Sequence, residues 1–315
     1  MVMASRAQSS LDFVDIAVSP YAAAVGGDAV TADFTDLAMT YHNPALLDSV
    51  VDKQFLVLYN PYLGDVQRFA VGYSLDEDRF RSLAFHLNFM DYGKISETDE
   101  TGNVIGEYLA QQYHLKISKA FIQGPFSLGV AGSFALTNIG GQTQQAFLAD
   151  VGGIYRHPEI NWVVGMVFRN MGISFGGVQP PGFSREVFDV VLGSTIKPKY
   201  MPFRFTLTVA GLPNEMSEFE VRQRRLDFLE RSMRYISVGT SLVLSNTIEF
   251  SIGYNHLRRQ ELRLESEAFG AGLSFGSLLR VKSFTIQITQ MTFNAAGGST
   301  FLSVQNDFNS LKKIF

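Results

Sequence analysis

The sequence lacks cysteine, and it also lacks any run of roughly 18 or more apolar residues, the length that a membrane-spanning helix needs. The first absence excludes disulfide frameworks and thiolate metal sites. The second excludes an α-helical membrane protein. The formal net charge of −4 at pH 7 provides no basic surface for nucleic acid, so we expect none as a partner.

The first residues, MVMASRAQSSLDF, lack the charged start and the apolar core of about 7–15 residues that define a secretory signal. Two interpretations fit this observation. The protein stays inside the cell, or the sequence begins within or after a removed signal, which suits the small residues of ASRAQSS.

Residues 126–136, FSLGVAGSFAL, alternate large apolar residues with Ser, Gly and Ala. A period of two predicts a β-strand. A half-buried strand of a soluble protein would carry long polar side chains on its second face, and this strand does not. The pattern therefore predicts bulky side chains against lipid and small ones against a lumen.

The same alternation recurs in fourteen segments of about ten residues, the length of a tilted strand that crosses a bilayer. Short and long connections alternate between them, with SLL (277–279) among the short links and GKISETDETGNVI (93–105) among the long loops. An even strand number with alternating loop lengths predicts an all-β, 14-stranded antiparallel transmembrane barrel over residues 51–308, followed by a tail at 309–315. The expected strands lie near 53–60, 65–75, 81–92, 106–120, 125–137, 143–156, 160–171, 186–197, 202–211, 232–244, 247–257, 266–276, 280–292 and 299–308.

The alternation also predicts which side chains face lipid and which face the lumen. We expect the long connections outside the cell and both termini on the periplasmic side. The residues expected against lipid are Phe126, Phe134, Phe203, Phe205, Phe250 and Ile252, and those expected in the lumen are Ser127, Ser133, Thr206 and Glu249.

Residues 1–50 do not alternate, and they contain the Ala-rich stretch SPYAAAVGGDAVTADFTDLAMTYHNPALL (19–47). A barrel lined with small residues leaves room for a filler. We therefore expect a helical or irregular plug here, in or under the barrel. The alternative is an ordinary N-terminal helix of a soluble domain.

Nothing in the sequence indicates catalysis, a cofactor or a metal site, so we expect a protein that is not an enzyme. GLSFG (272–276) matches the G-x-S-x-G motif of hydrolases, but Ser274 lies inside an alternating strand rather than at a strand-to-helix turn. The five histidines show no metal-ligand spacing. His86 and His114 fall on neighbouring strands, and two imidazoles alone rarely form a site.

Several stretches resemble FadL-like outer-membrane barrels, especially the branch that belongs to the type IX secretion system of the Bacteroidota. They are PYAAAVGGDAVTADFTDLAMTYHNPALL, YGKISETDETGNVIGEY, PFRFTLT, GYNHLRRQELRLE and FNAAGGSTFLSV, in that order along residues 15–308. The resemblance implies an outer-membrane scaffold that holds a PorZ-like surface protein and works with PorU and PorV. In that attachment complex, secreted cargo is processed and joined to lipopolysaccharide.

A FadL-type transporter of hydrophobic small molecules is the alternative function. It would need a lateral opening or a kinked strand, for which Gly140-Gly141 and Gly152-Gly153 are candidates, and a greasy lumen. For the scaffold, we expect the partner to bind a long connection that mixes apolar residues with arginine. The candidate partner-binding residues are Phe219, Arg222, Arg224, Arg225 and Phe228, with Asp99 and Glu100 on a second loop.

Overall fold

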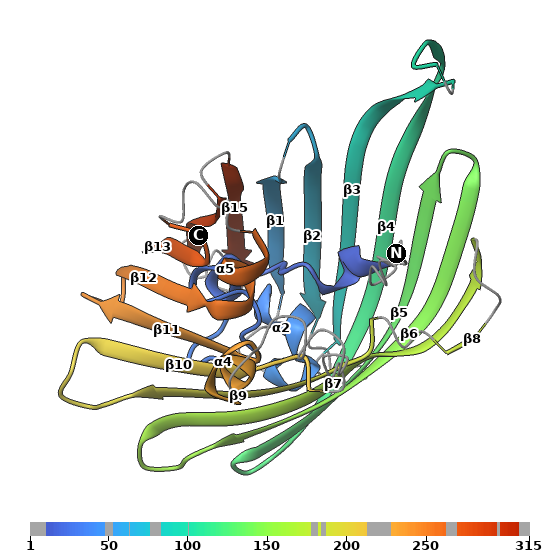
Figure 1. Ribbon diagram of the computed structural model, residues 1–315. Helices are drawn as coiled ribbons and strands as arrows, with labels where there is room; N and C mark the ends of the chain where they lie inside the picture. Colours follow the sequence, from blue (N-terminus) through green and yellow to red (C-terminus); the bar gives the residue numbers. More distant parts are fainter. Residues whose placement is uncertain are drawn as a thin grey trace.

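The computed structural model describes residues 11–47, 53–62, 64–75, 83–99, 101–177, 182–183, 187–212, 228–262, 270–294 and 297–308. Its main feature is a closed antiparallel β-barrel. Neighbouring strands follow the order of the chain, β1 pairs with β15, and pairing of β6 with β7 completes the closed sheet. Figure 1 shows the strands curving around the N-terminal segment, drawn in blue.

Fifteen strands are described, and β8 (Gly182–Phe183) is a two-residue strand that pairs only with β7. The remaining fourteen form the barrel, so the predicted fold class is confirmed. They are β1 (Gln54–Pro61), β2 (Gln67–Leu75), β3 (Leu83–Thr98), β4 (Val104–Gln123), β5 (Phe126–Ile139), β6 (Gln142–Arg156), β7 (Asn161–Gly176), β9 (Asp189–Lys197), β10 (Phe203–Val209), β11 (Ile236–Val243), β12 (Ile248–Asn255), β13 (Leu273–Val281), β14 (Phe284–Asn294) and β15 (Gly297–Asp307).

The two faces of the wall follow the predicted alternation. Phe126, Phe205 and Phe250 point outward and are 59%, 41% and 50% exposed, whereas Thr206 and Glu249 point inward and are buried. The other residues assigned to a face agree in direction, with Phe134 and Ser133 only half-buried. Bulk therefore lies outside and small or polar groups lie inside, as a barrel in a lipid bilayer requires.

Two predicted connections are wrong. The stretch 93–105 is largely a hairpin rather than a loop, because β3 and β4 continue to Thr98 and from Val104. The predicted link SLL lies inside β13, and the turn comes at 282–283, where Lys282 has a φ of 53°. The alternation of LSFGSLLRV continues through SLL, whereas Gly270 and Gly272, with φ of 87° and 81°, end the preceding connection.

The turns at 124–125, 157–160, 198–202, 244–247 and 282–283 lie at one end of the barrel, which we call the short-turn rim. The opposite end, which we call the long-loop rim, carries the long connections between β10 and β11 and between β12 and β13, together with the two-residue turn at 140–141. Two helices belong to these connections, α4 (Phe228–Met233) and α5 (His256–Leu262). Among the described residues, no helix is long and apolar enough to cross a membrane.

Residues 11–47 form a buried segment inside the barrel, which we call the plug (Figure 1). Its short helices are η1 (Asp12–Asp15), α1 (Pro20–Ala24), α2 (Met39–His42) and η2 (Pro44–Leu46). Helix α1 begins with a proline after Ser19, whose side chain accepts the Ala22 N–H and so caps the helix. The predicted outer limits of the N-terminal and C-terminal parts, at 1–10, 48–52 and 309–315, fall outside the described residues.

The outward direction of β5 can be tested by Val130→Arg. Val130 is 44% exposed on the outer face, and an arginine near the bilayer midplane costs about 2–4 kcal/mol in a membrane barrel. We expect a loss of that size in the free energy of unfolding, measured by urea titration in lipid vesicles. Val130→Leu is the control and should leave it nearly unchanged; an equal effect of both substitutions would contradict the assignment.

Candidate functional site

The inner face of the wall binds the plug through hydrogen bonds from many strands. Arg68 on β2 is fully buried and donates to the carbonyl oxygens of Ala17 at 2.5 Å and Ile16 at 2.9 Å. Other wall side chains contact the plug in the same way: Ser127 with Ala45, Thr195 with Thr31, Thr206 with Tyr21, Asn255 with Gly26, Thr289 with Pro20 and Gln305 with Leu37. The small and polar inner residues therefore match the backbone and side chains of one particular segment.

The two histidines on neighbouring strands also bind the plug. His114 Nδ1 lies 2.6 Å from the hydroxyl of Tyr41, and His86 Nε2 lies 2.9 Å from the hydroxyl of Thr40. His42 of the plug accepts the backbone N–H groups of Val18 and Ser19, both at 3.1 Å. The described part of the chain holds no group of three or more His, Cys, Asp or Glu that could bind a metal ion.

Buried ion pairs connect the wall with the plug at two heights. Arg204 on β10 pairs with Asp33 of the plug and with Glu249 on β12. Near the long-loop rim, Arg169 on β7 lies 2.9 Å from Asp189 and 3.7 Å from both Asp15 and Asp28 of the plug. Such pairs hold one arrangement, because removing one partner leaves an uncompensated buried charge.

A third buried pair lies within the wall, where Lys116 on β4 contacts Asp150 on β6. The Lys116 ammonium also donates to the carbonyl oxygen of Tyr41 at 2.7 Å. Sequence reasoning expected small residues here and missed these charges. The available signal was a charged residue at an inward position of the alternation, Lys116 on β4 and Asp150 on β6.

Glycines on the inner face allow the plug backbone to lie directly against the wall. A Cβ at Gly253 would overlap the backbone of residues 24–26, and one at Gly129 would overlap Pro44 and Ala45. A Cβ would also overlap atoms of the plug at five further inner-face glycines: Gly152, Gly165, Gly193, Gly239 and Gly276. These glycines serve close packing rather than strand bending, since Gly152 and Gly153 pair regularly with Gly129 and Leu128.

One cavity among the described residues lies inside the barrel. A cavity of about 240 Å³ lies between plug and wall near the long-loop rim. Carboxylates of the plug face wall residues across it; the lining includes Asp12, Asp15, Asp28, Tyr62, Arg258, Phe293 and Phe301. This cavity combines acidic groups with aromatic and aliphatic side chains, among them Ile16 and Met291.

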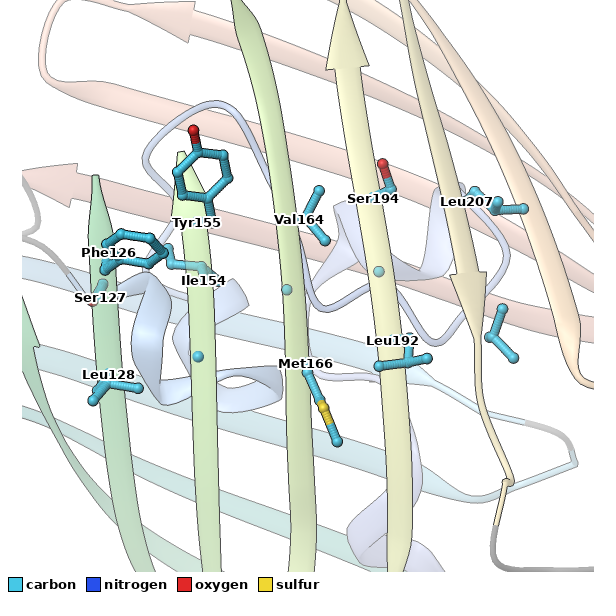
Figure 2. Close-up of a pocket in the computed structure, with 14 residues that line it drawn as sticks. Phe126, Ser127, Leu128, Ile154, Tyr155, Val164, Met166, Leu192, Ser194 and Leu207 are labelled. Carbon is cyan, nitrogen blue, oxygen red and sulfur yellow. The ribbon is translucent and has the colours of Figure 1, made fainter. Parts of the chain in front are cut away.

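A larger hollow, of about 490 Å³, lies on the outer surface of the wall and is almost wholly apolar. We call it the outer groove. It crosses β5, β6, β7, β9 and β10, and Figure 2 shows its side chains on these neighbouring strands with the plug behind them. Its lining includes Phe126, Leu128, Gly153, Tyr155, Val164, Met166, Leu192, Ser194, Leu207 and Val209.

The predicted partner-binding residues are only partly described. Five of them lie outside the described residues: Phe219, Arg222, Arg224, Arg225 and Glu100. Phe228 is described only as the first residue of α4. Asp99 lies at the tip of the β3–β4 hairpin and is half-buried. Its carboxylate accepts the backbone N–H groups of Thr101 at 2.9 Å and Asn103 at 2.8 Å. Hydrogen bonds from Thr101 and Asn103 lower the pKa of Asp99 to about 2.

The same hairpin projects beyond its neighbours at the long-loop rim (Figure 1). Pairing of β3 with β2 ends at Asp91, and pairing of β4 with β5 ends at Ala110. Beyond these points, residues 94–98 and 104–109 pair with each other alone among the described strands. We call this part the arm; Val104, Ile105 and Leu109 on it are 65%, 63% and 54% exposed.

Comparison with known proteins shows similarity to solved barrels only. No family model matches the chain, and no curated protein matches it. The structure is similar to that of the "TodX monoaromatic hydrocarbon channel deltaS2 mutant", with 11% identity, a TM-score of 0.49 and coverage of 93% of this chain and 97% of that one. It is also similar to a Pseudomonas aeruginosa FadL homologue, with 10% identity, a TM-score of 0.47 and coverage of 90% of this chain and 96% of that one. A third similar structure is Acinetobacter baumannii Omp33, with 11% identity, a TM-score of 0.40 and coverage of 82% of this chain and 99% of that one.

The fit between wall glycines and plug can be tested by Gly253→Ala. The added methyl group would overlap the plug backbone, and overpacking of this kind costs roughly 1–3 kcal/mol. We expect a loss of that size in the free energy of unfolding, with faster proteolysis of the plug. Gly132→Ala is the matched control, because no atom lies within 4 Å of a Cβ there. Equal behaviour of the two variants would contradict the packing argument.

The turn at the tip of the arm can be tested by Asp99→Ala. Loss of the acceptor should release the N–H groups of Thr101 and Asn103 and raise their hydrogen exchange, while exchange in the barrel strands stays constant. Because the folded-state pKa of Asp99 is lowered, the stabilisation is present above the ordinary carboxyl pKa and is lost as pH falls through about 2. Glu107→Ala removes only the exposed pair with Lys94 and is the control; slow exchange at Thr101 in the Asp99 variant would refute this role.

Proposed function

We propose that this chain is an outer-membrane scaffold of the type IX secretion system attachment complex, a PorQ-like barrel that holds a PorZ-like surface protein. The observation that carries the proposal is the filled lumen. Hydrogen bonds, ion pairs and inner-face glycines join the plug to strands around the barrel. A barrel whose interior is committed to its own N-terminal segment is suited to present its rims rather than to conduct.

The location in the outer membrane is supported by the outer face. Large apolar side chains are exposed around the wall, among them Phe69, Leu115, Phe147, Leu207, Phe275 and Ile288. Exposed apolar area of this extent marks a surface that another apolar phase covers. A closed barrel satisfies its backbone hydrogen bonds internally and is one of the two architectures that lipid allows. The longer connections then face the cell exterior.

The partner in this proposal binds at the long-loop rim. The arm carries exposed apolar side chains, and its two outer backbone edges pair with no other described strand, which makes them a template for a strand from another chain. The stretch 215–231, in the connection between β10 and β11, offers Phe219 and Phe228 among several arginines. PorU-like and PorV-like components complete the complex, and lipopolysaccharide is the acceptor of the cargo that the complex anchors.

A second candidate function is a FadL-type transporter of hydrophobic small molecules. The observation in its favour is an irregularity of the wall: the β6–β7 register shifts between Ala149 and Val151, and Asn170 on β7 has a φ of 59°. Gly140-Gly141, by contrast, forms the β5–β6 turn with φ of 57° and 78° rather than a kinked strand. The two FadL-type structures similar to this chain, one of them a monoaromatic hydrocarbon channel, agree with this candidate better than with a scaffold, although identities of 11% and 10% support a shared fold alone.

Two loop variants separate these functions. One deletes residues 216–229, and the other replaces 96–107 with Asn-Gly, a turn that joins the paired residues Ile95 and Tyr108. Both should form heat-modifiable barrels, and the scaffold predicts that at least one loses most of the co-purifying surface partner and its cargo anchoring.

Glu159→Ala, an exposed change on the short-turn rim, is the control and should retain the partner. Full partner retention by both loop variants would refute docking at these two sites. Fatty-acid uptake into vesicles that depends on the barrel would instead support the transporter.

A further inference from the structure

We infer that the outer groove is a binding site for an acyl chain of a membrane phospholipid, in the leaflet next to the short-turn rim. The inference rests on the membrane location in the proposed function, not on the scaffold role. Its basis is the combination of an apolar hollow, small residues at its floor, aromatic residues at its edge and basic residues at the rim beside it.

The groove exists because two outward positions are small where their neighbours are large. Gly153 on β6 lies beside Leu128 on β5 and Met166 on β7, its direct pairing partners. Ser194 on β9 lies opposite Val164 on β7. Leu128, Met166 and Leu192 stand around this floor in Figure 2 and are 63%, 37% and 39% exposed.

The plug packs against the inner face of the wall directly behind the outer groove. Gly129 pairs with Gly152, and Gly165 pairs with Gly193, on the inner side of the same strands. These glycines contact residues 30–31 and 43–45 of the plug. At these four positions only backbone separates the outer groove from the plug, and the buried side chain of Ile154 lies beside them.

The groove has the polarity and the length of an acyl-chain site. The Ser194 hydroxyl oxygen accepts the indole N–H of Trp162 at 2.9 Å, and the Ser127 hydroxyl donates to the carbonyl oxygen of Ala45 in the plug, so both serine hydroxyls of the lining are already engaged. The groove crosses five strands, and four spacings of about 4.8 Å give roughly 19 Å, comparable to an extended acyl chain. In a bilayer, water in so apolar a hollow would lack hydrogen-bond partners, so we expect an apolar chain to fill it.

Residues at the adjacent rim favour a phospholipid over an uncharged hydrocarbon. Tyr155 and Trp162 lie close to the turn at 157–160, the position of the aromatic girdle of membrane barrels. Basic residues lie at the same rim: Arg156 ends β6, Lys197 ends β9 and Lys199 lies in the turn at 198–202. Glu159, in the turn at 157–160, is an acidic residue near them. A phosphate at this level would meet mainly positive charge.

The test compares two outward glycines. Gly153→Leu fills the groove, and a Cβ at Gly153 meets the wall only at ordinary contact distance, 3.5 Å from Leu128. Gly132→Leu adds the same side chain on the outer face of β5, outside the groove and with nothing within 4 Å. Each barrel is reconstituted into vesicles of phosphatidylethanolamine and phosphatidylglycerol with added oleate, extracted in mild detergent and weighed by native mass spectrometry.

We expect the unsubstituted barrel and the Gly132→Leu variant to retain one phospholipid, and Gly153→Leu to retain at least fivefold less. Heat-modifiable gel mobility confirms that each variant is folded. Equal phospholipid retention by the two variants, or retention of oleate alone, would overturn the inference. Loss of a co-purifying membrane protein from Gly153→Leu without loss of lipid would also overturn it, since the groove would then be a protein contact.

The same preparations keep this inference separate from the scaffold proposal. If Gly153→Leu loses the lipid but keeps the surface partner, the lipid site stands and docking lies elsewhere. If the loop variants lose the partner but keep the lipid, docking at the rim stands independently of the groove.

Discussion

The structure depends on the contact between the inner face of the barrel and the plug. The inner face carries buried Arg, Lys, Asp and Glu side chains, and each would be costly to bury without a partner. Arg68 illustrates the point, because its guanidinium is fully buried and bonds the carbonyls of Ala17 and Ile16 and the side chain of Asn88. The wall is therefore stable in this form only with the plug in place.

The plug in turn relies on the wall, since its helices are too short to be stable alone. Helix α1 has five residues and α2 has four. Polar partners and glycines fix different aspects of the contact. The ion pairs of Arg204 and Arg169 select where the plug carboxylates lie, whereas Gly129 and Gly253 set how near its backbone can approach. The two kinds of residue together specify one depth and one orientation of the plug.

The alternation of side chains made the barrel predictable, because Phe126 to Leu136 and the similar segments follow a period that only strands share. Strand boundaries were less predictable where the alternation continued through an expected connection. This happened in the arm, where β3 and β4 are longer than expected, and in β13. The plug contacts were not predictable in detail. Lys116 and Asp150 are far apart in sequence, and only the pairing of β4, β5 and β6 brings them together. The outer groove depends on Gly153 and Ser194 meeting across three strands, which no local pattern reveals.

Because the plug occupies the lumen, the surfaces available to other molecules lie on the outside of the barrel. Inside, nearly every described strand contacts the plug, and a cavity of about 240 Å³ is lined in part by plug carboxylates. Outside, the arm offers unpaired strand edges beyond the rim, and the outer groove offers an apolar site within the wall. The glycines that admit the plug on one side of β6, β7 and β9 lie directly behind the groove on the other. The plug thus supports both the closed interior and the shape of the membrane-facing surface, and a change in its position would alter the two together.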